Sequence, residues 1–200
     1  MEDRFLEHYV REIGAQAAVA RLSASALGEA LAGADPAAVP VLAAAQGLVG
    51  AALQVTRLLW PHPAAVRPDG RPLSTAQERR RQWTSDRAQS LRRVVGPIDE
   101  QSSALGLRGA RGALERFDEY VDAYLLGVAD GTRSDVAADL EIGPRSAVAP
   151  PVVCLRHLDS GPALLLSVLD REVALHPLME EIERVAALAD AWRPAATPSC

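Results

Sequence analysis

The sequence contains no lysine: all 21 of its basic residues are arginine. This absence excludes Walker-type nucleotide hydrolases, Schiff-base enzymes and protein kinases, because each class depends on a lysine side chain. The two cysteines, Cys154 and Cys200, are too few for a disulfide framework or a cysteine-based zinc site, and the four histidines are scattered. The first residues alternate charged and apolar types without a signal-peptide core. We therefore expect a cytoplasmic protein with no metal and no cofactor.

Aromatic residues are also scarce, at 4% of the chain against 48% hydrophobic residues, most of them Ala, Leu and Val. This composition favours closely packed helices in a single domain over a sandwich or barrel. No charged residue occurs from Pro36 to Thr56, but Gln46 and Gln54 interrupt this Ala-rich stretch. It indicates a helix buried on all sides within the protein, not a membrane span. The net charge of -5 disfavours nucleic-acid binding over the whole surface.

Apolar periodicity, proline and glycine divide the chain into helices. A capping-box pattern, Ser74 with Gln77, precedes the third of four predicted long helices. The helices span about 3–31, 36–60, 75–95 and 102–126.

The last third of the sequence has a different residue pattern. Two short apolar runs, VVCLRHL and ALLLSVL, are joined by DSGP and predict a β-hairpin, and helical spacing returns in HPLMEEIERVAALADAW. The expected fold is therefore mostly α, a four-helix up-down bundle with a C-terminal β-hairpin and a closing helix. We expect the bundle over 1–128, the hairpin and closing helix over 129–193 packed on the same domain, and a disordered tail over 194–200.

Charged residues border the apolar face of the third and fourth predicted helices. Burial of an unpaired guanidinium is costly, so each such arginine should meet a carboxylate. If the two helices form an antiparallel hairpin, Arg80 lies near Asp118 and Arg87 near Glu115. These residues and Asp122 are the predicted structural ion pairs.

Three glycines in the fourth predicted helix, Gly106, Gly109 and Gly112, are spaced three apart. Each costs a helix about 1 kcal/mol relative to alanine, so we expect a compensating close approach of another helix. That helix could belong to the same chain or to a second copy, and we expect a homodimer.

The segment from Arg67 to Arg93 holds eight arginines and three acidic residues. Arg79, Arg81 and Trp83 form a candidate patch for RNA or an acidic partner. The alternative is an arginine-rich helix whose charged face is simply solvated.

Several fragments in this order resemble a bacterial family of HEPN-like domains (higher eukaryotes and prokaryotes nucleotide-binding). They are LLWP at 58–61, RAQSLRRVVG at 87–96, LRGARGALERFDEYVD at 107–122, and the end of the chain around LRHLD and PLMEEIERVAAL. The resemblance covers most of the chain and would make residues 1–128 a HEPN-like bundle. In that family an Arg and a His, five residues apart, cut RNA without a metal. Arg111 matches the Arg, but Arg116 stands where the His belongs.

The substitution at Arg116 removes the proton acceptor that the resemblance implies, because an arginine stays protonated at neutral pH. We therefore expect a non-catalytic binding or interaction protein, with a second copy or another protein as partner. One alternative is a metal-independent, RNA-acting enzyme that uses Arg111, Glu115 and Arg116. A second is an antitoxin or accessory partner of another protein.

Overall fold

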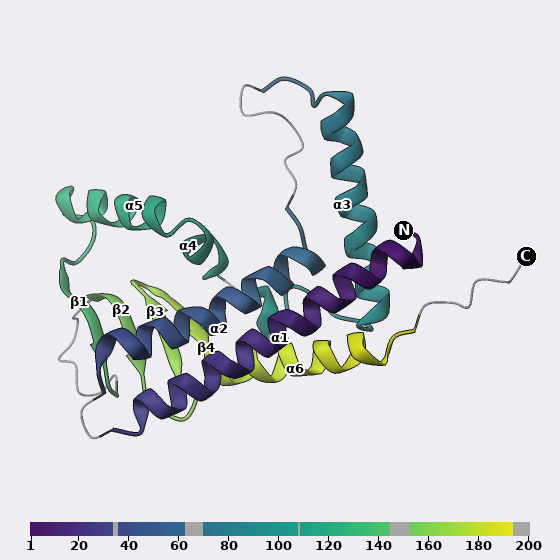
Figure 1. Cartoon of the computed structure of the whole chain (residues 1–200). Coiled ribbons are helices and arrows are strands. Elements are labelled where there is room, and N and C mark those ends of the chain that lie inside the picture. Colours follow the sequence, from purple (N-terminus) through teal and green to yellow (C-terminus); the bar gives the residue numbers. More distant parts are fainter. Residues whose placement is uncertain (34–35, 63–69, 108, 145–152, 194–200) are drawn as a thin grey trace, which may run out of the picture.

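The computed structural model describes residues 1–33, 36–62, 70–107, 109–144 and 153–193, and the predicted tail at 194–200 lies outside them. Within these ranges the chain forms six α-helices, a short 3-10 helix and a four-stranded sheet (Figure 1). The predicted four-helix up-down bundle with a single hairpin is wrong, because the predicted fourth helix is broken and the strands form a four-stranded mixed sheet instead of one hairpin.

The longest helices, α1 (Asp3–Leu31) and α2 (Ala38–Leu59), form an antiparallel pair, and α6 (Leu175–Ala191) lies along α1. All three were predicted from their apolar periodicity, and the structure confirms them. Each buries a stripe of Ala, Leu, Val or Ile at helical spacing, for example Ile13, Ala17 and Ala20 of α1.

Helix α2 is not buried on all sides as predicted. It contacts α1, α3, α6 and the sheet, but residues at helical spacing remain exposed on one stripe: Val39, Ala43, Gln46, Gln54 and Arg57. Among the described helices α2 alone is long and apolar enough to cross a membrane, with 44% of its most apolar window buried, and core helices of globular proteins meet the same criteria.

Helix α3 (Thr75–Val94) begins at the predicted capping box, which the structure confirms. The Ser74 hydroxyl accepts a hydrogen bond from the Gln77 backbone N–H, and the Gln77 side chain accepts one from the Ser74 N–H. Only the second half of α3 is buried, at Ala88, Ser90 and Leu91, and its first half projects from the body (Figure 1).

The sheet has the order β1-β2-β3-β4 and is mixed. The predicted hairpin is confirmed as β2 (Val153–Asp159) and β3 (Leu165–Val168), which are antiparallel. Two further strands were not predicted: β1 (Val136–Ile142), which runs parallel to β2, and β4 (Arg171–Ala174), which is antiparallel to β3.

The predicted fourth helix is broken into three pieces. They are the 3-10 helix η1 (Ala104–Gly106), α4 (Arg111–Glu115) and α5 (Phe117–Ala129). Leu107 adopts a left-handed conformation with φ 50°, and Arg116 leaves the helical region with φ -133° and ψ 58°. Because the segment is broken, the described residues do not form one long fourth helix that could pair with α3 along its length.

The glycines of this segment have local roles. A Cβ on Gly106 would lie 1.9 Å from the Glu100 carbonyl oxygen, and Gly109 has φ +69°. The first glycine permits a close backbone approach and the second a turn. A Cβ on Gly112 would meet only the end of the Arg116 side chain. The three glycines therefore give no support to a helix face that binds a second copy, and the homodimer stays a prediction.

Gly106→Ala should lower the free energy of unfolding by about 2 kcal/mol, because backbone must move to admit the methyl group. Gly28→Ala, in α1, is the matched control, since a Cβ there meets no atom within 4 Å. It should raise stability by about 0.5–1 kcal/mol through helix propensity. Urea unfolding of both variants checks this, and equal effects would contradict the assigned role of Gly106.

Candidate functional site

The C-terminal end of α2 is bound by several arginine side chains. The last carbonyl groups of a helix have no intrahelical partner, and a helix C-terminus carries partial negative charge that favours cations. Three guanidinium groups from later segments donate hydrogen bonds to these carbonyl oxygens, and we call them the arginine cap. The donors and acceptors are Arg87 to Arg57 (3.0 Å), Arg92 to Leu59, and Arg111 to Trp60 (3.1 Å).

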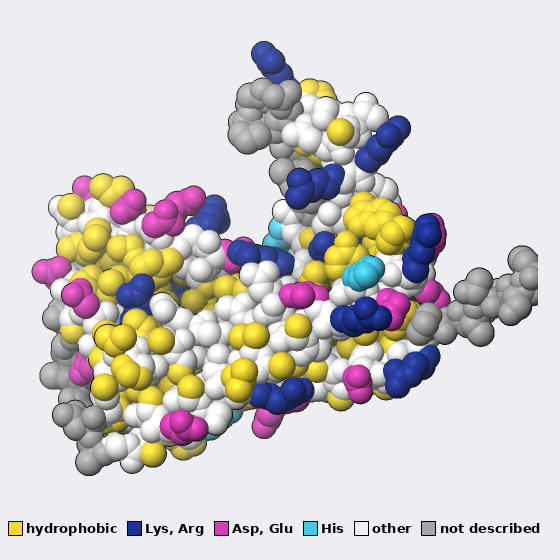
Figure 2. Space-filling view, in the orientation of Figure 1, with side chains coloured by type: hydrophobic (Ala, Val, Ile, Leu, Met, Phe, Trp, Pro, Cys, Tyr) yellow, Lys and Arg dark blue, Asp and Glu magenta, His cyan; other side chains and the backbone are white. Residues whose placement is uncertain are grey.

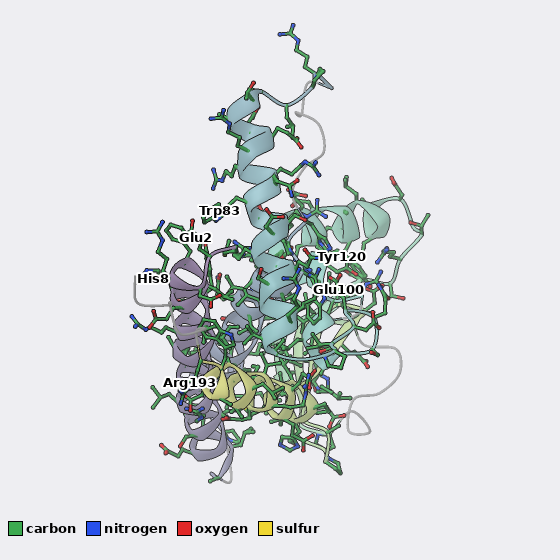
Figure 3. The ribbon with its side chains drawn as sticks, turned by 90° about the vertical axis from the view of Figure 1, so that its right-hand side faces the viewer. Glu2, His8, Trp83, Glu100, Tyr120 and Arg193 are labelled. Carbon is green, nitrogen blue, oxygen red and sulfur yellow. The ribbon has the colours of Figure 1, made fainter. Side chains whose placement is uncertain are left out.

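Arg111 is the most enclosed member of the arginine cap. Its Nη1 lies 2.8 Å from Glu100 Oε1, and its Nε lies 3.3 Å from Glu115 Oε1. Only 11% of the side chain is exposed. Glu100, labelled in Figure 3, also faces His62 at 3.5 Å. The Arg111 guanidinium thus has a structural partner on each of its three nitrogens.

Glu115 is shared by two arginines, since Arg57 Nε lies 3.0 Å from the same Oε1 atom. Partial burial raises the pKa of Glu115, but the hydrogen bonds from Arg57 and Arg111 outweigh burial, and the pKa lies below its usual range. A carboxylate held ionised by two guanidinium groups is a weak proton acceptor at neutral pH.

The predicted ion pairs between α3 and the fourth helix are replaced by other contacts. Arg87 bonds the Arg57 carbonyl oxygen, not Glu115, and lies 5.3 Å from the Tyr9 ring centroid. Within the described ranges no ion pair joins Arg80 to Asp118 or Asp122. The pairing fails because α4 and α5 do not run antiparallel to α3 (Figure 1).

Arg116 lies apart from Arg111 and Glu115. Its side chain is 68% exposed and contacts Glu119 at 3.3 Å. It borders a shallow hollow with Arg171 and Tyr120, which is labelled in Figure 3. The structure therefore does not bring Arg111 and Arg116 to a common site.

The candidate RNA patch is divided between opposite sides of α3. Arg81 forms a two-pronged contact with Glu78. Trp83 points toward α1 (Figure 3), where its Nε1 lies 3.3 Å from the Tyr9 hydroxyl and its ring meets Phe5 edge-on. Arg79 is exposed. A stacking platform flanked by both arginines is not present.

An apolar pocket of about 240 Å³ lies between α2, the start of α5 and the sheet. Helix α2 forms one wall of the pocket, where Leu42, Gln46 and Gly50 are partly or fully exposed. Figure 2 shows hydrophobic side chains gathered around α5 and the adjoining end of the molecule. The lining residues are Leu42, Gln46, Val49, Gly50, Leu53, Leu114, Phe117, Arg156, Leu166 and Val168.

Among the described residues that line this pocket, Arg156 of β2 is the one cation. Its guanidinium carbon lies 4.2 Å from the Phe117 ring centroid. Across the described part of the chain, no carboxylate or carbonyl oxygen accepts a hydrogen bond from it. Arg156 differs in this from the arginines at the end of α2, each of which donates to at least one oxygen.

Three aromatic side chains hold α5 to the sheet side of the molecule. Phe117 contacts Arg156, the Tyr120 hydroxyl bonds Asp170, and the Tyr124 hydroxyl lies 3.2 Å from the Ser134 carbonyl oxygen. Leu125 and Leu126, which follow Tyr124 in α5, are exposed. Polar contacts rather than close apolar packing thus fix α5 over the pocket.

Cys154 is buried in β2, with Sγ 3.0 Å from Glu141 Oε2. Burial and the neighbouring carboxylate raise the pKa of this thiol to about 11, so it is a poor nucleophile at neutral pH. No group of three or more His, Cys, Asp or Glu residues suited to a metal ion occurs in the ranges that the structure describes.

Comparison with known proteins gives no relatives: no family model, no curated protein and no solved structure matches the chain.

Arg111→Met should lower the free energy of unfolding by about 3 kcal/mol, because two carboxylates and a helix end lose their shared partner. Arg116→Met is the matched control and should change stability by less than about 0.5 kcal/mol, since its ion pair is exposed. Chemical denaturation measures both. Equal losses would contradict the central position of Arg111.

Glu115→Gln should be less stable than the wild type at neutral pH. A carboxylate whose pKa is lowered by folding contributes stability above its unfolded pKa and loses that stability as pH falls through the folded pKa. The gap between the two proteins should therefore close in acid. Thermal unfolding across a pH series measures the gap, and a gap that widens on acidification would exclude this role.

Proposed function

We propose that the chain is a non-catalytic binding protein whose binding site is the apolar pocket between α2, α5 and the sheet. The observation that carries the proposal is the pocket itself, which combines a mostly apolar lining with two polar side chains, Gln46 and Arg156. Small-molecule sites have this make-up: apolar walls supply affinity and a few polar groups fix orientation.

The composition of α2 supports this choice. A helix without a charged residue from its start to Thr56 is expected to be buried, and α2 instead keeps one side partly open toward the pocket. Exposed apolar surface costs free energy and in natural proteins marks binding sites. Of the three large apolar α2 residues in the lining, Leu42 is partly exposed and Val49 and Leu53 are already almost fully buried, so a ligand would cover mainly Leu42 on this helix.

The state of Arg111 supports the non-catalytic part of the proposal. A catalytic guanidinium must reach the reacting phosphate, whereas this one is enclosed by Glu100, Glu115 and the Trp60 carbonyl group. We propose that residues 107–122 are a HEPN-like segment in which Arg111, at the Arg position of the pattern, binds the end of α2, and in which Arg116 stands at the His position.

The neutral fluorophore N-phenyl-1-naphthylamine tests the pocket directly. It should bind the wild-type chain with a rise in fluorescence, and Gly50→Leu should abolish this binding, because Gly50 lines the pocket and a Cβ there meets open space. Gly28→Leu, the same change in α1, should bind like the wild type. Circular dichroism checks that both variants fold.

Two results would contradict the proposal. One is fluorophore binding that Gly50→Leu leaves unchanged, which would place the ligand elsewhere. The other is cleavage of mixed RNA by the purified chain that disappears in Arg111→Ala, which would favour the RNA-acting alternative.

A further inference from the structure

We infer that the ligand of this pocket is a small molecule with one carboxylate group and an apolar body, and that Arg156 binds the carboxylate. The inference rests on the proposed function and adds the chemical class of the ligand. It depends on the juxtaposition of an unpaired guanidinium with an apolar cavity in the same lining.

The Arg156 side chain is partly exposed, and its guanidinium rests against the Phe117 ring, which offers no oxygen acceptor for the N–H groups. At the end of α2, by contrast, four arginines each donate to at least one oxygen acceptor: Arg57, Arg87, Arg92 and Arg111. At Arg156 the described chain supplies none, and an anionic ligand would complete the site.

Stacking on Phe117 holds the Arg156 guanidinium in place, and this restricts where the anion can bind. An aromatic ring against the guanidinium fixes the side chain and reduces the freedom lost when a ligand binds. A guanidinium presents paired N–H donors that match the two oxygens of a carboxylate. Gln46 on the facing helix adds an amide to the same lining.

The single positive charge in the described pocket lining favours a ligand with one negative charge. Arg156 is the single cation among the described lining residues, so a phosphate with two negative charges would be only half compensated in an apolar cavity. The remaining walls are aliphatic or aromatic, including Leu53, Leu114 and Leu166. An apolar carboxylate satisfies both parts of the site.

Competition with the bound fluorophore separates this inference from the proposed function. Decanoate should displace N-phenyl-1-naphthylamine from the wild-type chain at about tenfold lower concentration than decanol, since a charge-assisted hydrogen bond is added to the same apolar tail. Arg156→Gln should still bind the fluorophore but lose the preference for decanoate. Arg156→Lys should keep part of the preference, because the positive charge remains.

Arg133→Gln is the matched control. Arg133 also stacks on an aromatic residue of α5, with its guanidinium carbon 4.7 Å from the Tyr124 ring centroid, but it does not line the pocket. This variant should keep the preference for decanoate even if α5 loosens. A loss of preference in both variants would show that Arg156 acts only by supporting α5 and would overturn the inference.

The outcomes distinguish the two proposals. If the fluorophore does not bind, or binds outside the pocket, the proposed function fails and the inference fails with it. If the fluorophore binds in the pocket but decanoate and decanol compete equally, the inference alone is wrong. Preference for decanoate that survives in Arg156→Gln would also overturn it.

Discussion

The structure depends on guanidinium groups that satisfy the carbonyl end of α2. The Trp60 N–H closes the last turn of this helix on the Thr56 carbonyl oxygen, and the carbonyl groups that follow need donors from outside the helix. Arg87 and Arg92 from α3 and Arg111 from α4 supply the missing donors. The same contacts tie α3 and the segment around α4 to α2, which links parts of the chain that are distant in sequence.

The arginine cap also explains the division of roles along the segment that resembles HEPN-like domains. Its most enclosed residue, Arg111, donates hydrogen bonds to a backbone carbonyl group and to carboxylates. These bonds would have to break before the guanidinium could contact a substrate. The chain breaks its helix at Arg116, so α5 departs from α4 and reaches over the sheet. A pocket remains between α2 and α5, and it is there, not beside Arg111, that a cation lacks an acceptor.

The long helices were predictable because the spacing of apolar side chains and the capping residues indicate them in the sequence. The bounds of α1 and the capping box at Ser74 are examples. Strand β1 was missed although its apolar residues alternate along VAADLEI, since alanine and acidic residues have low strand propensity. Strand β4 has only four residues, two of them charged.

The contacts of the site were less predictable for a different reason. The need of Arg87 for a partner was evident from its position, but its acceptor is a backbone carbonyl, which leaves no mark in the pattern of side chains. Arg156 likewise stands in a run that reads as an ordinary strand, and only the fold brings it against Phe117 and α2. The break at Arg116 was hidden because the residues around it are helix formers.

The most direct measurement is a double-mutant cycle between Arg111 and Glu100, whose side chains meet at 2.8 Å in a largely buried contact. Arg111→Met, Glu100→Gln and the double variant are unfolded in urea beside the wild type. If Arg111 binds the end of α2 and its carboxylates as described, the coupling free energy is about 1–3 kcal/mol. Additive losses, with coupling near zero, would show that this guanidinium does not join the segments and would contradict the central claim.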